Sequence, residues 1–206
     1  MPNNKDLDFS TDFTGLDFYN IDSQFTEDEI AVREATREWV ESRFLSMNPE
    51  TGVSVIETHC RNGTFPIELA KEFGEMGLLG INLDGYGCPG MSNIAYGLAC
   101  QELERGDSGL RSFASVQGSL CMYPIHAFGS EEQKNKYLPK MASGELIGCF
   151  GLTEPDHGSN PGGMVTRAVD DGDSYVINGA KMWITNGTIA DVAVVWAKLD
   201  GVIRGF

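Results

Sequence analysis

Apolar residues recur along this chain with two different periods, and the change falls near Gly144. Before that point the period is about 3.6 residues, which is typical of amphipathic helices, and after it the period is about 2, which is typical of strands. The sequence therefore predicts an α+β fold, with an all-α helical domain over residues 25–145 followed by an antiparallel β-domain over residues 146–206. Residues 1–24 are polar and acidic with scattered aromatic side chains, and we expect an extended leader that docks on the main body.

Capping patterns mark where the first helices begin. Thr26 and Glu29 have the spacing of a capping box, and the helix that follows is predicted to end before Pro49. Residues 47–63 show no clear period. Pro66 is placed to open the next helix in its first turn.

The second half of the helical domain repeats these signals. Ser92 is a good N-cap for a helix over residues 94–105, and another helix is expected from Ser108. Ser130 begins a second capping box, and the short helix after it is predicted to end before Pro139, because proline disfavours helical geometry at the preceding residue.

Beyond Gly144, short alternating segments are separated by turn pairs such as Asn178-Gly179 and Asp200-Gly201. The predicted strands span residues 146–152, 164–169, 174–177, 180–185 and 192–199, and one short strand fits after residue 201.

The charge balance limits the possible partners. The 206 residues carry a formal net charge of −15, which disfavours both nucleic acid and anionic membrane surfaces as partners. No apolar run approaches the roughly 20 residues that a membrane helix needs. The first residues lack the apolar core of a signal peptide and the arginine-rich character of a transit peptide, so we expect a cytoplasmic protein.

Cysteine and histidine usage does not point to a metal site. The five cysteines are scattered, odd in number and free of Cys-x-x-Cys spacing, so reduced and mostly buried thiols are expected. His59 and Cys60 are adjacent rather than spaced as chelating ligands, and His126 and His157 lie far away in the sequence. No metal is expected.

A polar loop follows the strand predicted for residues 146–152. It begins at Thr153 and is dense in hydroxyls, glycine and backbone donors, a composition that suits a planar polar ligand. Pro155 favours extended geometry before it, and Gly158 permits positive φ, so the loop can turn its N–H groups to one side. An ordinary transition from strand to loop would explain the same residues.

A second segment pairs a large aromatic side chain with a hydroxyl. If residues 180–185 form a strand, Trp183 and Thr185 leave the same face and a flat ring could stack there. The alternative is that Trp183 is a core residue, which is the usual role of tryptophan in a strand.

Together these two segments resemble the acyl-CoA dehydrogenases, and residues 101–112 and 148–159 follow the pattern of the glutaryl-CoA dehydrogenases within that family. The resemblance runs from about residue 24 to residue 206. It implies an FAD cofactor, with the Trp183 match stacking near the flavin and the Thr185 match bonding its reactive nitrogen. The implied cofactor-binding residues are Phe150, Gly151, Leu152, Thr153, Glu154, Pro155, Asp156, His157, Gly158, Ser159, Trp183, Ile184 and Thr185.

The same resemblance implies a substrate site. The residues that match Arg111 and Ser112 grip the distal carboxylate of a dicarboxylyl chain, Glu104 orients the arginine, and Ser159 lies near the phosphates or the thioester ligand. A guanidinium fork suits a carboxylate well. Without the resemblance, Arg111 is explained equally by an exposed ion pair with Glu104 or Asp107.

Some features of the family are altered or missing. Asn160 stands where the family usually has Asp, and Gly163 where it often has Ser. The resemblance covers only the first half of such an enzyme, so we expect the family's C-terminal helical domain, which supplies the glutamate base and the tetramer core, to be absent, and no catalytic residue is assigned here.

The implied reaction is the oxidative decarboxylation of glutaryl-CoA to crotonyl-CoA, with electron-transfer flavoprotein as the acceptor and a homo-oligomer as the full-length form. This chain is expected to be incomplete alone. The alternatives are the dehydrogenation of another acyl-CoA, a non-catalytic fragment that binds acyl-CoA or a partner, and the product of a truncated gene.

Overall fold

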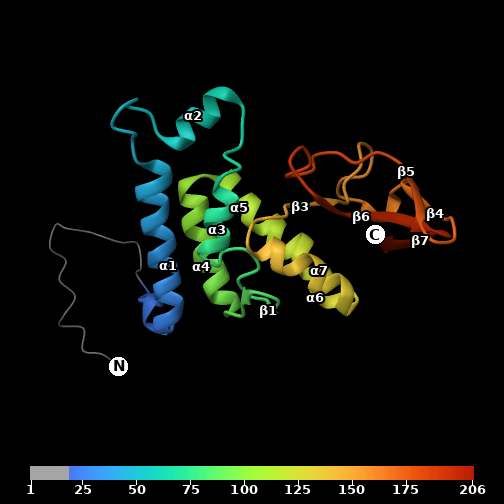
Figure 1. The fold of residues 1–206 in the computed structure, drawn as a ribbon, viewed down its shortest axis with the longest axis horizontal. Helices are drawn as coiled ribbons and strands as arrows, with labels where there is room; N and C mark the ends of the chain where they lie inside the picture. The colour runs from blue at the N-terminus through green and yellow to red at the C-terminus, as the bar shows by residue number, and fades with distance from the viewer. Residues whose placement is uncertain (1–18) are drawn as a thin grey trace.

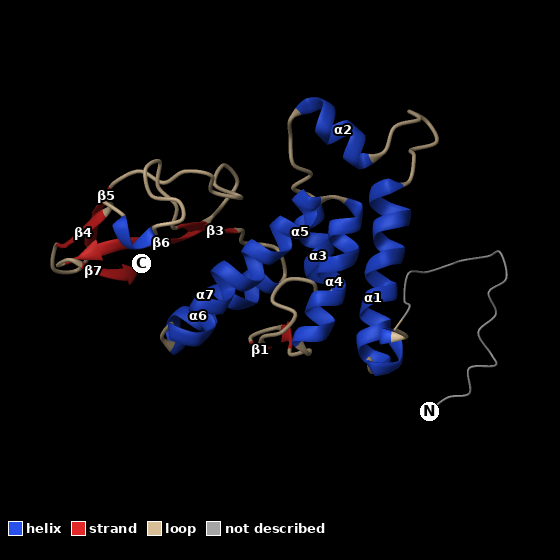
Figure 2. Ribbon diagram, turned by 180° about the vertical axis from the view of Figure 1, so that it is seen from behind, coloured by secondary structure: helices blue, strands red, loops and turns tan. Residues whose placement is uncertain are grey.

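The computed structural model describes residues 19–206, and it confirms the α+β fold with helices first and strands second. Figures 1 and 2 show the helices gathered on one side of the molecule and the strands that follow residue 145 on the other. Of the leader predicted for residues 1–24, residues 1–18 lie outside the described part, and Ile21–Gln24 form the 3₁₀ turn η1.

The helical part is a bundle of mostly short helices, with α2 lying apart from the others (Figure 1). Its elements are α1 (Glu27–Trp39), η2 (Val40–Leu45), α2 (Val55–Asn62), α3 (Leu69–Glu75), α4 (Asn93–Gly106), α5 (Ser108–Ser115), η3 (Val116–Met122), α6 (Tyr123–Phe128) and α7 (Glu131–Ala142), with a small hairpin of β1 (Asp84–Gly85) and β2 (Cys88–Pro89).

The predicted caps are present. The Thr26 hydroxyl accepts from the Glu29 N–H at 3.3 Å, and the Thr26 N–H donates to the Glu29 carboxylate at 2.9 Å, which completes the capping box of α1. Ser92 caps α4, and Ser130 forms the second capping box at α7. Each cap satisfies backbone donors that a helix start leaves unpaired.

A prediction in the helical part is wrong, and one helix was not predicted. The helix at Ser130 does not end before Pro139 but continues to Ala142. Leu138 and Met141, on either side of the proline, are both fully buried, and this burial outweighs the roughly 3 kcal/mol that an interior proline costs a helix. The helix that was not predicted is α2, which lies within residues 47–63 and begins after its N-cap residue, Ser54.

Aromatic side chains form the centre of the helical core. Phe73 and Phe113 are almost fully buried and meet edge to face, with 5.8 Å between ring centroids. Trp39 packs on Phe73 at 5.1 Å, and Phe65 packs on Phe113 at 5.0 Å. This cluster links α1, α3 and α5 to the stretch between α2 and α3.

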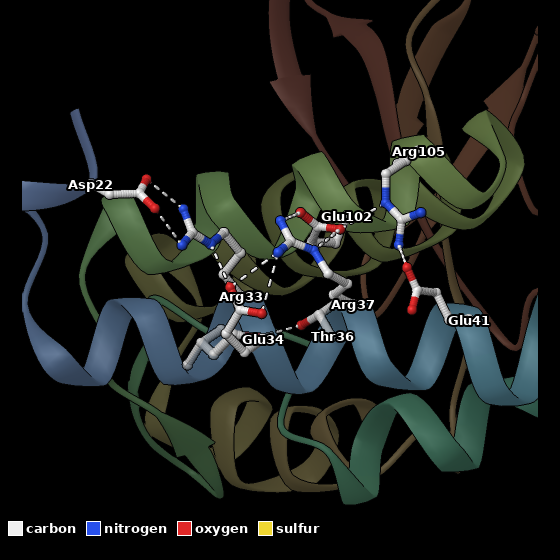
Figure 3. A network of polar contacts seen from close by, with 9 residues as sticks. Asp22, Arg33, Glu34, Thr36, Arg37, Glu41, Glu102 and Arg105 are labelled. Atoms are coloured by element: carbon white, nitrogen blue, oxygen red, sulfur yellow. Dashed lines mark hydrogen bonds and ion pairs between the residues drawn. The ribbon is translucent and has the colours of Figure 1, made fainter. Parts of the chain in front are cut away.

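A network of charged side chains joins α1 to α4 (Figure 3). The Glu102 carboxylate is almost fully buried and accepts from Arg37 at 2.8 Å and from Arg105 at 2.9 Å. Burial alone would raise the pKa of Glu102, but the two guanidinium groups outweigh it and lower that pKa. Arg33 makes a two-pronged contact with Asp22 at the start of the same network.

The sheet consists of β3 (Gly148–Gly151), β4 (Arg167–Asp170), β5 (Tyr175–Asn178), β6 (Val192–Leu199) and β7 (Val202–Gly205). Its order is β3-β6-β4-β5, and β7 also pairs with β6. The antiparallel prediction holds for β4–β5 and β6–β7, but β3 and β4 run parallel to β6. Long connections return the chain to the same end of the sheet in both parallel pairs, as parallel strands require.

One buried side chain connects the helices to the sheet. Gln117 in η3 is completely buried and donates to the carbonyls of Met141 at 3.0 Å and Leu146 at 2.7 Å. Its own carbonyl accepts from the N–H of Gly148 at 2.7 Å. Because these bonds hold the start of β3, the helical core fixes where the loop after β3 begins.

Candidate functional site

The two segments that the sequence singled out lie against each other. The N–H of Met182 donates to the carbonyl of Thr153 at 2.9 Å, and the Asn186 side-chain amide donates to the carbonyl of Gly148 at 3.1 Å. The loop that leaves β3 therefore runs along residues 181–186, although the segments are almost 30 residues apart in sequence.

The strand predicted for residues 180–185 does not form. Trp183 has a left-handed φ of 60°, and residues 185–189 form turns, so Trp183 and Thr185 do not alternate along a strand. A left-handed residue interrupts extended geometry. Trp183 is also not a core residue, because its side chain is 82% exposed.

A buried ion pair holds the two segments together. The Glu154 carboxylate accepts from the N–H groups of Val165 at 2.7 Å and Thr166 at 3.0 Å and from the Lys181 ammonium at 2.9 Å. Lys181 also donates to the carbonyl of Leu152 at 3.0 Å. The Glu154 side chain is 1% exposed and the Lys181 side chain 13%. We call Glu154 and Lys181 the loop clamp.

The loop clamp lowers the pKa of the Glu154 carboxyl. Burial alone would raise the pKa of Glu154, but the N–H groups of Val165 and Thr166 and the Lys181 ammonium together lower that pKa from 4.5 to about 2. A depressed pKa means that the carboxylate stabilises the fold above the unfolded pKa and that this contribution is lost as the pH falls toward the folded pKa.

We therefore expect Glu154→Gln to be most destabilising at neutral pH. The difference in unfolding free energy between wild type and variant should be largest above pH 4.5 and shrink as the pH falls toward about 2. Urea unfolding followed by circular dichroism from pH 6 to pH 3 measures it. A difference that does not change with pH would contradict the assignment.

Beyond the clamp the loop makes a tight turn. Glu154 and His157 exchange two backbone hydrogen bonds, of 3.3 and 3.1 Å, around Pro155 and Asp156. Pro155, Asp156, Gly158 and Ser159 are exposed, while His157 is half-buried. The loop thus presents its tip to solvent from a fixed base.

The other predicted cofactor residues occupy different environments. Phe150 meets Trp196 edge to face, with 6.0 Å between centroids, and Gly151 is buried in β3. Leu152, Thr153 and Ile184 are half-buried, and Thr185 is exposed.

A cavity of about 590 Å³ lies between the helical part and residues 185–189, at the end of the segment around Trp183. It brings Ser112 of α5, a predicted substrate residue, to the same space as Thr185, a predicted cofactor residue. Sequence reasoning missed several other lining residues, because they lie in stretches with no period or outside the quoted motifs. The full lining is Gly63, Thr64, Phe65, Ile67, Gly109, Ser112, Thr185, Asn186, Thr188 and Ile189.

Arg111 precedes Ser112 in α5 but is not among the residues that line this cavity. Its guanidinium donates to the Glu104 carboxylate and, at 3.3 Å, to the Ser115 hydroxyl. The hydrogen bond to Glu104 is the main reason that the pKa of Arg111 is raised, so the side chain stays cationic. At 37% exposure, the Arg111 side chain remains accessible to a ligand.

The remaining predictions concern metals, thiols and membranes. Within residues 19–206, no group of three or more His, Cys, Asp or Glu side chains is arranged to hold a metal ion. All five cysteines are free; Cys121 and Cys149 are buried, whereas Cys60 is exposed. The same described range contains no helix long and apolar enough to cross a membrane.

Comparisons with known proteins match both parts of the chain. The N-terminal domain of acyl-CoA dehydrogenases matches residues 26–145, and the middle domain of the same proteins matches residues 149–205.

The chain is similar to a glutaryl-CoA dehydrogenase from Mycobacterium smegmatis solved with FADH2, at 54% identity and a TM-score of 0.84 over 91% of this chain and 47% of that one. An acyl-CoA dehydrogenase from Bacillus anthracis solved with FAD is 33% identical, with a TM-score of 0.78, over 89% of this chain and 31% of that one. A short-chain specific acyl-CoA dehydrogenase of Clostridium acetobutylicum is 39% identical over 183 residues, 87% of this chain and 46% of the relative. The chain thus spans less than half the length of each of these proteins.

Proposed function

Because the chain belongs to the acyl-CoA dehydrogenase family, we propose that it forms the helical and middle portions of an FAD-dependent enzyme that oxidises an acyl-CoA. The helical portion is residues 25–145 and the sheet portion residues 146–206. The observation that carries this proposal is the cavity of about 590 Å³ that Ser112 and Thr185 share, because it joins the substrate side and the flavin side of the site.

The residues around the two segments fit a flavin. Trp183, which is 82% exposed, lies beside a loop fixed at its base, and Thr185 is among the residues that line the cavity. An exposed aromatic face can stack on a flat ring, and a fixed hydroxyl can donate to its edge. FAD, when bound, accepts the electrons removed from the substrate.

The residues of this chain orient the ligand and stabilise negative charge on it. Thr153, held through its carbonyl by Met182, and Thr185 offer hydroxyl donors toward negative charge that develops on a ligand. The exposed turn at Pro155 to Ser159 offers further backbone donors, which suits an anion in a protein of net charge −15.

We favour glutaryl-CoA as the substrate and its oxidative decarboxylation as the reaction. Arg111 stays cationic, remains accessible and is oriented by Glu104, and the adjacent Ser112 lines the cavity. A carboxylate at the tail of an acyl chain is the complementary group. The similarity to the Mycobacterium smegmatis enzyme supports this choice. Electron-transfer flavoprotein is the proposed electron acceptor, and a homo-oligomer the proposed assembly.

A second candidate is the dehydrogenation of a short acyl-CoA without a second carboxylate. It is favoured by the 39% identity to the short-chain specific enzyme of Clostridium acetobutylicum. The two candidates differ in whether Arg111 contributes to substrate affinity.

The flavin proposal is tested by titrating the purified chain with FAD and following fluorescence. Trp183→Ala should weaken binding by about 2- to 10-fold, the equivalent of one aromatic stacking contact. Phe128→Ala is a matched control, because Phe128 is 83% exposed but lies on α6. If Trp183→Ala binds FAD as tightly as wild type, or if both variants lose affinity equally, the proposed flavin site is wrong.

The substrate proposal is tested with the FAD-loaded protein. Arg111→Gln should weaken binding of glutaryl-CoA by roughly 10- to 100-fold, the value of one hydrogen bond to a charged group, and leave butyryl-CoA binding unchanged. Arg61→Gln removes an exposed arginine on α2 that pairs with Glu57, and it serves as the control. No loss for either thioester would favour the second candidate, and equal losses for both would mean that Arg111 does not select the distal carboxylate.

A further inference from the structure

We propose that the loop clamp, Glu154 with Lys181, is a positioning pair that fixes residues 152–153 against residues 182–186 and does not itself contact the ligand. This inference rests on the proposed function for the identity of the ligand, but the geometry of the clamp can be tested without it. It moves Glu154 out of the group of cofactor contacts and gives a role to Lys181, which the family resemblance left unassigned.

The contacts of Glu154 point inward. Its carboxylate is held by two backbone N–H groups, of Val165 and Thr166, and by the ammonium of Lys181, all within 3.0 Å. With its side chain 1% exposed, it has no surface left to offer a ligand. A carboxylate with three donors is satisfied and rigid, which is what a support for a binding loop requires.

Lys181 and its neighbour Met182 bind several successive residues of the loop. The ammonium of Lys181 lies between the carbonyl of Leu152 and the carboxylate of Glu154, and the next residue, Met182, donates its N–H to the carbonyl of Thr153. Two successive residues of one segment thus hold three successive residues of the other.

The stem of Lys181 also follows the end of β3. A side-chain carbon placed on Gly151 would come within 3.4 Å of the Lys181 Cγ, so the aliphatic part of the lysine passes over this glycine. Lys181, in the second segment, therefore contacts both the end of β3 and the loop that follows it.

The clamp fixes the start of the segment that carries the exposed residues Trp183 and Thr185. Lys181 is turned inward, and Trp183, two residues later, adopts left-handed geometry and points to solvent. Asn186 anchors the far end of the segment on the carbonyl of Gly148. Trp183 and Thr185 are held between these two anchors, so a change at Lys181 alters their placement without removing any group that faces the ligand.

Buried ion pairs can often be replaced by apolar side chains with little loss of stability, because desolvation offsets the attraction between the charges. What an apolar side chain at residue 181 cannot do is donate to both Leu152 and Glu154. The inference therefore predicts a local loss of geometry in Lys181→Met and its recovery in Lys181→Arg.

The first measurement is amide hydrogen exchange on the 206-residue chain without FAD. In Lys181→Met the amides of Val165, Thr166 and Met182 should exchange at least about tenfold faster, which corresponds to about 1.4 kcal/mol of local opening. Lys181→Arg should restore most of the protection. Arg37→Met is the matched control, because it removes one cation from the buried carboxylate of Glu102 in the helical part.

The second measurement is FAD affinity for the same variants, at a temperature where each is folded. Lys181→Met should bind FAD about tenfold more weakly than wild type and Lys181→Arg nearly as well, whereas Arg37→Met should be unchanged. Unchanged local exchange in Lys181→Met overturns the proposal, and so does faster exchange with undiminished FAD affinity. If the wild-type chain alone binds no FAD, the exchange data decide whether the clamp positions the loop, and they do so whether or not the proposed function holds.

Discussion

Phe113→Ala is expected to lower the free energy of unfolding by roughly 3–5 kcal/mol, which is the range for truncating a buried phenylalanine. Phe113 is 1% exposed and touches Phe73 edge to face and Phe65 in a stacked arrangement. The truncation removes both contacts and leaves a cavity where α5 meets α3. Native domains are typically stable by only about 5–15 kcal/mol, so this loss is a large share of the total free energy of unfolding.

Chemical denaturation of the purified variant measures this loss, and Phe128→Ala is its control. The control makes the same substitution at a phenylalanine that is 83% exposed, and we expect a change within about 0.5 kcal/mol. If the two variants lost similar stability, the aromatic cluster would not be the centre of the core. Phe65 also lines the cavity shared by Ser112 and Thr185, so the cavity's helical wall should loosen in Phe113→Ala.

Local signals in the sequence predicted the helical part well. The capping boxes at Thr26 and Ser130 and the cap at Ser92 are short-range patterns, and each formed the predicted hydrogen bonds. The prediction failed at Pro139 because the burial of Leu138 and Met141 is a tertiary effect. It missed α2 because this amphipathic helix spans only eight residues, too few for its spacing to stand out from the polar residues around it, and it buries none of them completely.

The sheet was predicted less well, because strand direction depends on contacts between distant residues. The strand predicted for residues 192–199 formed with those bounds, yet its parallel pairing with β3 and β4 has no local signal. The strand predicted for residues 164–169 began only at Arg167. Residues 180–185 look like a strand from alternation alone, but the inward turn of Lys181 and the left-handed Trp183 exclude it.

For the candidate site, the sequence singled out two segments but not the contacts that hold them together. The loop after β3 and the segment around Trp183 do lie together, linked by Met182 and Asn186. The ion pair between Glu154 and Lys181 could not be predicted, because both residues are ordinary surface types until the fold buries them. The roles of individual residues in binding remain proposals for the experiments above.

Gly144→Ala is expected to cost about 2–5 kcal/mol, the sum of two independent effects. Gly144 has a left-handed φ of 74°, which disfavours any residue with a Cβ. A Cβ at this position would also overlap the backbone carbonyl of Ala70 in α3, and backbone atoms cannot rotate away as a flexible side chain can. The turn after α7 must therefore separate from α3 to accommodate the methyl group.

Gly172→Ala separates these two effects. Gly172 has a φ of 80°, but nothing lies within 4 Å of the position that an alanine methyl would occupy there, so only the conformational cost of about 1–2 kcal/mol applies. Thermal and urea unfolding of both variants should show the larger loss for Gly144→Ala. Equal losses would mean that the turn is not packed against α3. Because Gly144 precedes β3 by four residues, a displaced turn should also weaken the Gln117 bonds that fix the start of the site loop, and faster exchange of the Gly148 amide would report it.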